Sequence, residues 1–339
     1  MEHVAIDLGG RESQICVRGG DGAITHETRI ATRELPRFLA GLPRSRVVLE
    51  TCAESFTVAD AARLSGHEVR VVPASLAPML GVGARKTKTD RRDSRVLSEA
   101  SCRIDLPSVH IPATESRDRK TMLSMHDVLV RSRTAMVNAV KGWMRTQLVR
   151  CRSGAVETFT TRMRQALEGE VIDSYIERVL ASIDALSQQI RASERELETV
   201  AKQDARCRQL MTMPGVGPMT SLAFVSTVDD VSRFENAHKV EAYLGLTPGE
   251  HSSSDRQQRL SITKAGSTRM RWLLVQAAWA ARRSAPADPM VVWSLQVEKR
   301  RGKRMALVAL ARKMAGVLFA MWRDQKPYDP TRGALTSTV

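Results

Sequence analysis

Four carboxylic acids stand where they could bind divalent metal ions and help to cut a phosphodiester bond. Asp7 and Glu50 each end a short apolar run, as expected at the end of a buried strand. Asp90 and Asp93 follow three positions apart, and on a helix both would project from one face. Carboxylate oxygens are ligands that Mg²⁺ prefers, and two bound ions can promote in-line displacement at phosphorus. This order of acids predicts a metal-dependent centre that acts on phosphodiesters.

Each acid taken alone also has a simpler interpretation. The helical pair could form ion pairs with Arg91, Arg92 and Arg95 on a solvated face, because runs of charge usually lie at the surface. The segment Ile6-Asp7-Leu8-Gly9-Gly10 is also similar to the first phosphate loop of actin-like ATPases, although no clear second phosphate loop or adenosine motif follows. The order of all four acids is more specific than any one of them.

A second segment that could bind phosphate is residues 213–218, where two glycines flank one apolar residue. Gly215, Val216 and Gly217 can form a tight turn that exposes backbone N–H groups beside the N-terminus of the next helix. Such amides bind a phosphate without reading the base sequence. The pattern is typical of a helix-hairpin-helix motif, and its simpler interpretation is an ordinary turn.

A third candidate is the serine-rich loop around residues 248–255. A serine nucleophile needs its hydroxyl near a base or a metal, and His251 or the metal-bound acids could serve. Three adjacent serines are otherwise most often a polar turn. Basic residues near the helical acids and near the serine loop could clamp phosphates or simply form solvated faces. They are Lys86, Lys88, Arg91, Arg92, Arg256, Arg259, Lys264, Arg269 and Arg271.

The whole chain is strongly basic, which favours a polyanionic partner. Its 339 residues include 52 Lys and Arg against 37 Asp and Glu, a formal charge of +15. That sign favours nucleic acid over a membrane, since the most apolar stretch, residues 305–322, carries Arg312 and Lys313 and is typical of an amphipathic helix. Five scattered cysteines without a CxxC pair favour reduced thiols and no zinc site, and the N-terminus does not resemble a signal peptide. We therefore expect a cytoplasmic protein.

The elements that would position the acids alternate along the first 80 residues. Short β-rich runs and turn residues predict strands at 3–7, 14–17, 23–28, 47–50 and 68–72, with helices at 33–40 and 57–65. A hairpin meander followed by αβ alternation predicts a mixed sheet covered by helices. Open sheets of this kind carry active sites at strand ends, where Asp7 and Glu50 fall.

From about residue 115 onward the pattern becomes helical. Apolar residues between 176 and 197 recur in steps of three and four, which predicts either one amphipathic helix or a coiled-coil hairpin or dimer arm. The expected seam consists of Ile176, Val179, Ile183, Leu186, Ile190 and Leu197. Beyond residue 209 the expected elements are helices near 219–226 and 239–244, a serine-rich turn and long closing helices. We therefore expect domains at 1–118, 119–208 and 209–339.

With its acids, glycine turn and serine loop in this order, the chain resembles a family of insertion-sequence transposases. These transposases combine a RuvC-like acid-tetrad domain with a C-terminal transposase domain and are also described as bridge-RNA-guided recombinases. The resemblance covers nearly the full length. It rests on Ala5-Ile6-Asp7-Leu8-Gly9, Leu49-Glu50-Thr51, Lys88-Thr89-Asp90-Arg91-Arg92-Asp93, Leu129-Val130-Arg131-Ser132-Arg133-Thr134, Met213-Pro214-Gly215-Val216-Gly217, Tyr243-Leu244-Gly245-Leu246-Thr247-Pro248, and Ile262-Thr263-Lys264-Ala265-Gly266 with Arg271 and Leu273-Leu274.

The resemblance implies a fold and a role for each part. The N-terminal domain would be α/β and RNase H/RuvC-like, the middle a helical coiled coil, and the C-terminal domain mainly α-helical with a helix-hairpin-helix. The acids Asp7, Glu50, Asp90 and Asp93 would bind Mg²⁺ in a two-metal site, and the serine loop would supply a nucleophile that links covalently to DNA. Alignment on the family loop selects Ser253, while Ser254 and Asp255 stand where glycines are usual and leave Ser252 and Ser254 as alternatives.

The same resemblance implies partners. They are DNA, a noncoding guide RNA and further copies of the chain as a dimer or tetramer, in a bacterial protein associated with the nucleoid. The acids and the serine lie roughly 160 residues apart in the sequence, so both predicted domains would contribute to the reaction. Three alternatives stay open: a RuvC-like nuclease or junction resolvase that forms no covalent link, an actin-like ATPase, and a nucleic-acid-binding protein without enzymatic activity.

Overall fold

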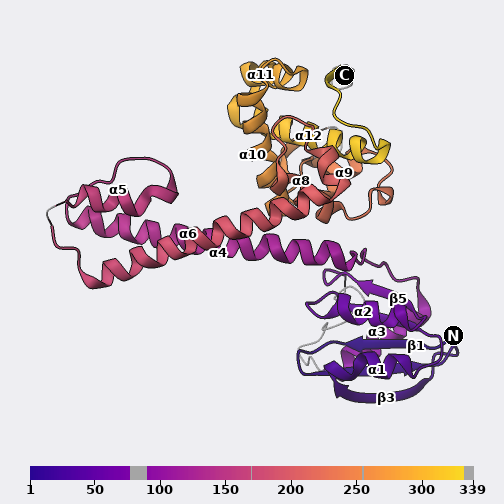
Figure 1. The fold of residues 1–339 in the computed structure, drawn as a ribbon. Coiled ribbons are helices and arrows are strands. Elements are labelled where there is room, and N and C mark those ends of the chain that lie inside the picture. Colours follow the sequence, from indigo (N-terminus) through magenta and orange to yellow (C-terminus); the bar gives the residue numbers. More distant parts are fainter. Residues whose placement is uncertain (77–89, 169, 254–255, 332–339) are drawn as a thin grey trace. The chain divides into compact units, whose positions relative to one another are not determined.

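The computed structural model describes residues 1–76, 90–168, 170–253 and 256–331, and the side chains of residues 250–260 lie outside the described part (Figure 1). The chain divides into two compact units, Met1–Pro112 and Ala113–Val339. We call them the sheet unit and the helical unit and treat each by itself.

The sheet unit is built on five strands in the spatial order β3-β2-β1-β4-β5. The strands are β1 (His3–Asp7), β2 (Glu12–Arg18), β3 (Ile24–Ala31), β4 (Arg46–Glu50) and β5 (Glu68–Val72). The first three form an antiparallel meander, and β4 and β5 continue the sheet parallel to β1. The predicted mixed sheet is confirmed, and the bounds of β1 and β5 agree with the sequence prediction to the residue.

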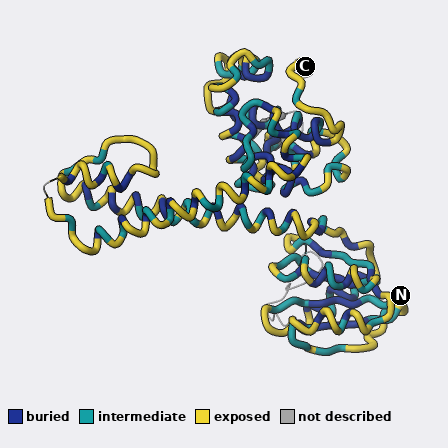
Figure 2. The backbone as a smooth tube through the Cα atoms, viewed as in Figure 1, coloured by how far each residue is buried: buried dark blue, intermediate teal, exposed yellow. Residues whose placement is uncertain are grey.

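Helices cover both faces of this sheet, as the continuous apolar runs at residues 4–6 and 47–49 of its central strands require. They are η1 (Thr32–Glu34), α1 (Leu35–Ala40), α2 (Ser55–Leu64) and α3 (Asp90–Arg103). Val4, Ile6 and Leu49 pack with residues of α1 and α2 on one face. Ala5 and Val48 lie on the opposite face and pack with Leu97 of α3. The central strands are therefore buried from both sides, as Figure 2 shows.

Two long helices open the helical unit and pack against each other. They are α4 (Thr114–Thr146) and α6 (Ser174–Gln203), with η3 (Val156–Thr158) and α5 (Phe159–Ala166) between them. Val137 of α4 packs in one cluster with Ile183 of α6, and Leu123 packs in another with Leu197, so the helices run antiparallel (Figure 1). The sequence left a single helix and a helical hairpin open, and the structure has an intramolecular hairpin.

The seam of α6 differs in part from the predicted one. Ile176, Ile183 and Leu197 are buried as expected, but Leu180 and Ser187 are buried where Val179 and Leu186 were expected. Arg133 of α4 reaches into this seam, and its Nη1 donates to Ser187 Oγ at 3.4 Å and to Glu157 Oε1 at 3.3 Å. A polar contact thus interrupts the apolar seam.

The rest of the helical unit packs around one large core. Its elements are α7 (Ala205–Leu210), α8 (Pro218–Val228), η4 (Val231–Arg233), α9 (Ala237–Tyr243), β6 (Pro248–Ser253), β7 (Arg256–Ile262), α10 (Thr268–Ser284), α11 (Pro289–Arg301) and α12 (Lys303–Asp324). Among the described residues, α12 is the one helix long and apolar enough to cross a membrane, and 61% of its most apolar window is buried inside the protein. Its apolar residues, Leu310 and Phe319 among them, belong to the core.

One prediction for this region was wrong. The serine-rich segment, expected as a polar turn, is part of a two-stranded antiparallel hairpin in which Ser253 pairs with Arg256 and Pro248 with Ile262. The base of the hairpin is fixed by backbone bonds, from Thr263 N to Thr247 O at 2.9 Å and from Lys264 N to Gly245 O at 3.1 Å. The hairpin strands therefore extend from an anchored base.

Candidate active site and nucleic-acid interface

The sheet places Asp7 and Glu50 at one edge and on one face. Both residues end parallel neighbouring strands, whose register pairs Ile6 with Leu49, the residues directly before them. Because side chains alternate along a strand, Asp7 points to the side of Ala5, and Glu50 to the side of Val48. That side is the face covered by α3. Adjacent strands lie about 4.8 Å apart, so the sheet brings these two carboxylates to the same place.

The direction of α3 brings its first turn to the same edge. Its last turns lie at the start of β1, where Ser101 Oγ is 2.8 Å from His3 Nδ1. Ser98 Oγ, one turn earlier, lies 3.3 Å from Sγ of Cys16, a residue paired with the middle of β1. The helix thus runs antiparallel to β1, and Asp90 and Asp93 in its first turn face the end of β1 that carries Asp7. Asp93 is buried, and Asp90 is exposed.

The donor set at this edge suits a hard cation such as Mg²⁺, because it consists of carboxylates. Within the described ranges, however, no three His, Cys, Asp or Glu side chains are close enough together to hold a metal ion. The sheet therefore aligns Asp7 with Glu50 and turns the helical pair toward them, without closing a four-ligand cluster. Of the basic residues expected beside this edge, Arg92 is exposed, and Lys86 and Lys88 lie outside the described residues.

Glu27 of β3 holds α3 on the sheet, a role that the sequence did not reveal. Its carboxylate accepts hydrogen bonds from Arg91 at 2.7 Å and from both Nε and Nη2 of Arg95, the latter at 2.6 Å. The hydrogen bond from Arg95 and the weaker one from Arg91 lower the pKa of Glu27 to about 2, against the opposing influence of burial. Two arginines considered as partners of the helical acids are therefore bound to a different acid.

We expect Glu27→Gln to loosen α3 and to change how stability depends on pH. The pKa of Glu27 is lower in the folded protein than in the unfolded chain, so its contribution is present above about pH 4.5 and lost as the pH falls towards 2. The variant should melt a few degrees lower at pH 7, and its melting temperature should fall less steeply over that acid range. Thermal unfolding followed by circular dichroism at several pH values measures both.

The matched control is Glu12→Gln. Glu12 pairs with Arg29 at 3.2 Å, but both side chains are more than half exposed, and such surface pairs contribute little to stability. Its melting curve should follow that of the unaltered protein. Identical pH profiles for all three proteins would contradict the role given to Glu27.

The predicted phosphate-binding turn lies between α7 and α8, but most of it faces the protein. Val216 is buried in the core of the helical unit. Gly215 has φ +82°, and a Cβ atom there would lie 2.2 Å from the carbonyl oxygen of Ala277 on α10, so only glycine fits. Gly217 is the N-cap of α8 and makes no side-chain cap. Gly217 and the first turn of α8 are the parts of the motif left to contact a ligand.

At residues 250–253 and 256–260 of the serine hairpin, only the backbone is described. Ser252 and Ser253 lie in β6, at its far end from the anchored base. Ser254 lies outside the described residues, as do the side chains of Ser252, Ser253 and His251. Arg256 and Arg259 lie on β7, and their side chains are outside the described part as well.

Two of the predicted basic residues beside the hairpin have internal partners. Arg269 forms an ion pair with Asp127 of α4, and burial lowers the pKa of Arg269 although Asp127 opposes this shift. Arg271 Nη1 donates to the carbonyl oxygens of Gly266 at 2.6 Å and Leu244 at 3.2 Å. Arg269 thus ties α10 to α4, and Arg271 holds the backbone next to the base of the hairpin. Lys264 is exposed and has no such contact in the part of the chain described.

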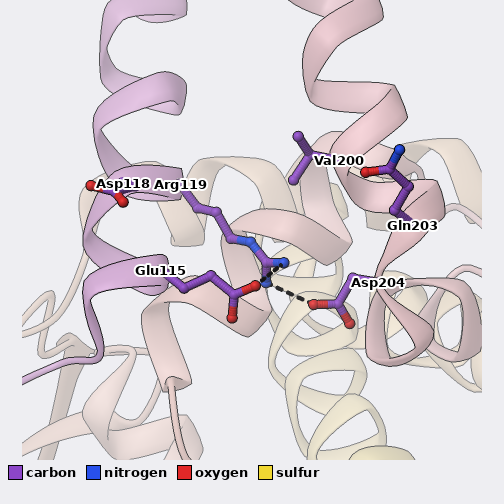
Figure 3. A pocket seen from close by; sticks show the side chains of 6 residues that line it. All are labelled: Glu115, Asp118, Arg119, Val200, Gln203 and Asp204. Atoms are coloured by element: carbon purple, nitrogen blue, oxygen red, sulfur yellow. Dashed lines mark hydrogen bonds and ion pairs between the residues drawn. The ribbon is translucent and has the colours of Figure 1, made fainter.

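A polar pocket of about 520 Å³ lies between the start of α4 and the end of α6 (Figure 3). Arg119 crosses it and donates to Asp204 Oδ2 at 2.7 Å and to Glu115 Oε1 at 2.8 Å. Burial raises the pKa of Asp204, but the hydrogen bonds from Arg206 and Arg119 outweigh it and hold this pKa below its usual range. Glu115, Arg119 and Asp204 bind one another, so this pocket joins the two helices.

Comparison with known proteins finds similarity to one family. Residues 207–290, which include the glycine turn, the serine hairpin and α10, match the model of the "Transposase IS116/IS110/IS902 family". Over 96% of its length the chain is 28% identical to the transposase of insertion sequence element IS1111A from Coxiella burnetii, covering 90% of that protein. A probable family 20 transposase from Pseudomonas aeruginosa is 28% identical, with 97% of this chain and 99% of the relative covered. The IS1328 transposase of Yersinia enterocolitica is 25% identical, with 94% and 96% covered.

The two kinds of similarity agree, since a segment match in the helical unit is accompanied by alignment along nearly the whole chain. The same family was indicated by motifs in both units. The chain is similar to the IS116/IS110/IS902 family of insertion-sequence transposases, in residues 207–290 by the family model and along nearly its whole length by the relatives.

Proposed function

We propose that this protein cuts and rejoins the DNA of an insertion sequence through a covalent link to Ser253, with Mg²⁺ held by Asp7, Glu50, Asp90 and Asp93. The observation that carries the proposal is the alignment of Asp7 and Glu50 on one face and edge of the sheet, with the first turn of α3 directed to them. The strand order and the position of these acids support a RuvC-like sheet unit. The family match over the serine hairpin supports the role of the helical unit.

The proposed reaction conserves the energy of the phosphodiester bond. The Ser253 hydroxyl loses its proton and forms an Oγ–P bond, while the bond from phosphorus to one DNA strand end breaks and that end takes up a proton. A hydroxyl of another strand end later attacks the phosphoserine, forms the new phosphodiester and returns the hydroxyl to the serine. Because each step exchanges one P–O bond for another, strands are exchanged without ATP.

The carboxylates supply the second part of the chemistry. When bound, Mg²⁺ polarises the phosphate and offsets the charge that develops on it. Asp7 and Glu50 are preorganised for such binding by rigid strands, and Asp93 by a buried helix turn. Arg91 and Arg95 of α3 bind Glu27 of β3.

The proposal also includes how a DNA sequence is selected. Aromatic residues make up only 4% of the chain, and no recognition helix or zinc finger stands out in its sequence. We infer that a noncoding guide RNA pairs with the DNA while the protein, as a homo-oligomer, contacts backbone and shape. The resemblance to guided recombinases supports this inference.

The experiment that tests the proposal looks for protein attached to DNA. Purified protein is incubated with Mg²⁺, the DNA ends of its element and the RNA co-expressed with it, and the products are separated on a denaturing gel. We expect a labelled DNA band that migrates with the protein and disappears after protease treatment. Cleaved DNA without such a band would instead support the second candidate, a RuvC-like nuclease that hydrolyses DNA with its carboxylates alone.

A further inference from the structure

The corner between α11 and α12 carries five basic residues within six positions. Lys299, Arg300 and Arg301 end α11, and Lys303 and Arg304 begin α12. All five are exposed. We call these five residues the basic corner. None of them was among the residues singled out from the sequence.

The positive charge of the basic corner is not balanced by neighbouring acids. The adjacent acid, Glu298, binds Arg282 of α10, with 2.5 Å between Oε2 and Nη1. Asp288, at the other end of α11, accepts hydrogen bonds from Met290 N and from the hydroxyl of Tyr328. Throughout the described ranges no ion pair reaches any of the five side chains. Five like charges held this close repel one another, so an anionic partner would stabilise them.

The corner has a defined geometry that holds these charges in place. Gly302 joins the helices at φ +82°, and its N–H donates to Glu298 O at 2.8 Å. Arg282 ties α10 to α11 through Ser294, with Nε 3.1 Å from Ser294 Oγ. Lys303 Nζ lies 4.7 Å from the centre of the Trp279 ring on α10, a contact that orients the ammonium and leaves its N–H groups available.

The placement of Lys303 and Arg304 also disfavours a purely structural role. Both stand in the first turn of α12, where the helix dipole favours negative charge and disfavours cations. A bound phosphate would be attracted by the dipole and by the five side chains together. The arrangement is therefore suited to an anion that lies across the corner.

We propose that the basic corner binds the phosphate backbone of duplex DNA, independently of base sequence and separately from the serine hairpin. The proposal rests on the proposed function for its choice of polyanion, because DNA is the substrate expected of this family. Lysine and arginine side chains on two helix ends can contact several phosphates, which positions a duplex without reading it.

The test compares two variants of equal net charge. In the first, the corner is neutralised by Lys299→Gln, Arg300→Gln, Arg301→Gln, Lys303→Gln and Arg304→Gln. In the control, five scattered exposed arginines without ion pairs in the described structure are replaced: Arg33→Gln, Arg37→Gln, Arg44→Gln, Arg63→Gln and Arg178→Gln. Fluorescence anisotropy with a duplex DNA of arbitrary sequence is recorded over a series of salt concentrations, together with a duplex RNA of the same length.

We expect the corner variant to bind duplex DNA at least tenfold more weakly at low salt. The slope of log K against log salt should fall by roughly 3–4, because each lost phosphate contact removes about 0.9. The control variant should keep most of the affinity and the slope. Equal losses of affinity in both variants would mean that the basic corner acts only through the net charge of the protein. A loss of affinity for RNA alone would mean that the corner binds RNA. Either result overturns the proposal.

Folding and chemistry are measured separately. An unchanged melting curve by circular dichroism shows that the corner variant folds. If that variant melts early, the double variant Lys303→Gln with Arg304→Gln replaces it, and its slope of log K against log salt should be intermediate. At saturating DNA the corner variant should still form the covalent adduct. Absence of an adduct with the unaltered protein would contradict the proposed function while leaving the binding comparison valid.

Discussion

Replacing Ser253 by alanine is expected to abolish the covalent DNA–protein adduct and to leave DNA binding unchanged. Alanine lacks the hydroxyl that forms the Oγ–P bond, and removing a nucleophile that no other group replaces lowers turnover by at least about 10³-fold. The position lies at the far end of β6 from its anchored base, so the loss of one oxygen should not disturb the core. Denaturing gels measure the adduct, and fluorescence anisotropy measures DNA binding by the same preparation.

Two neighbouring variants serve as controls and separate the remaining assignments. Ser252→Ala and Ser254→Ala should both retain the adduct, because alignment with the family selects the residue between them. If Ser252→Ala or Ser254→Ala abolishes the adduct while Ser253→Ala retains it, the nucleophile is that neighbour. If every single variant retains full recombination, the serine loop is not the source of the nucleophile.

Asp7→Asn and Glu50→Gln are each expected to lower strand cleavage by at least about 10²-fold while the protein stays folded and binds DNA. Both substitutions keep the size of the side chain and remove the negative charge that a divalent cation requires. The two residues end neighbouring strands on the α3 face, so either loss should impair the same centre. Chelation of divalent cations should reproduce the effect in the unaltered protein, and cleavage is measured on end-labelled DNA.

Glu99→Gln is the matched control for these carboxylates. Glu99 also lies on the sheet unit, but near the other end of α3, where it binds Arg103 and Arg18. Its loss should leave cleavage unchanged. Cleavage at the original rate by Asp7→Asn and Glu50→Gln would exclude the carboxylate edge as an active centre and favour a protein that binds nucleic acid without cutting it.

The strands of the sheet unit could be predicted because each one follows from a short local sequence pattern. Runs such as 3–7 and 68–72 are apolar, short and bounded by turn residues, so both the strand type and the bounds followed from the sequence. The position of Asp7 and Glu50 at strand ends followed from the same runs. Their common face needs one further step, the parallel register of β1 and β4, which only the structure provides.

Features that depend on distant partners were not predictable. Glu27 binds arginines that lie 64 and 68 positions away, and no local pattern distinguishes it from any exposed strand residue. Arg269 was a candidate for phosphate binding from the sequence, but it pairs with Asp127 of α4. The serine hairpin has little apolar alternation to reveal strands, since the sequences PGEHSS and RQQRLSI are mostly polar. On α6 the buried seam keeps the predicted seven-residue repeat, but its intermediate positions are Leu180 and Ser187. Ser187 meets Arg133 of the partner helix α4, a contact that no local pattern reveals.

The paired helices α4 and α6 can align in only one way. Arg133 finds its polar partners at Ser187 and Glu157, and Arg119 meets Asp204 nearer the other end of the pair. Sliding the helices by one heptad would break both sets of contacts, and separating one buried charged pair alone costs about 3–5 kcal/mol. With 33 residues in α4, a rise of 1.5 Å per residue gives about 50 Å. The hairpin therefore sets the distance between its two ends through a single register of polar contacts.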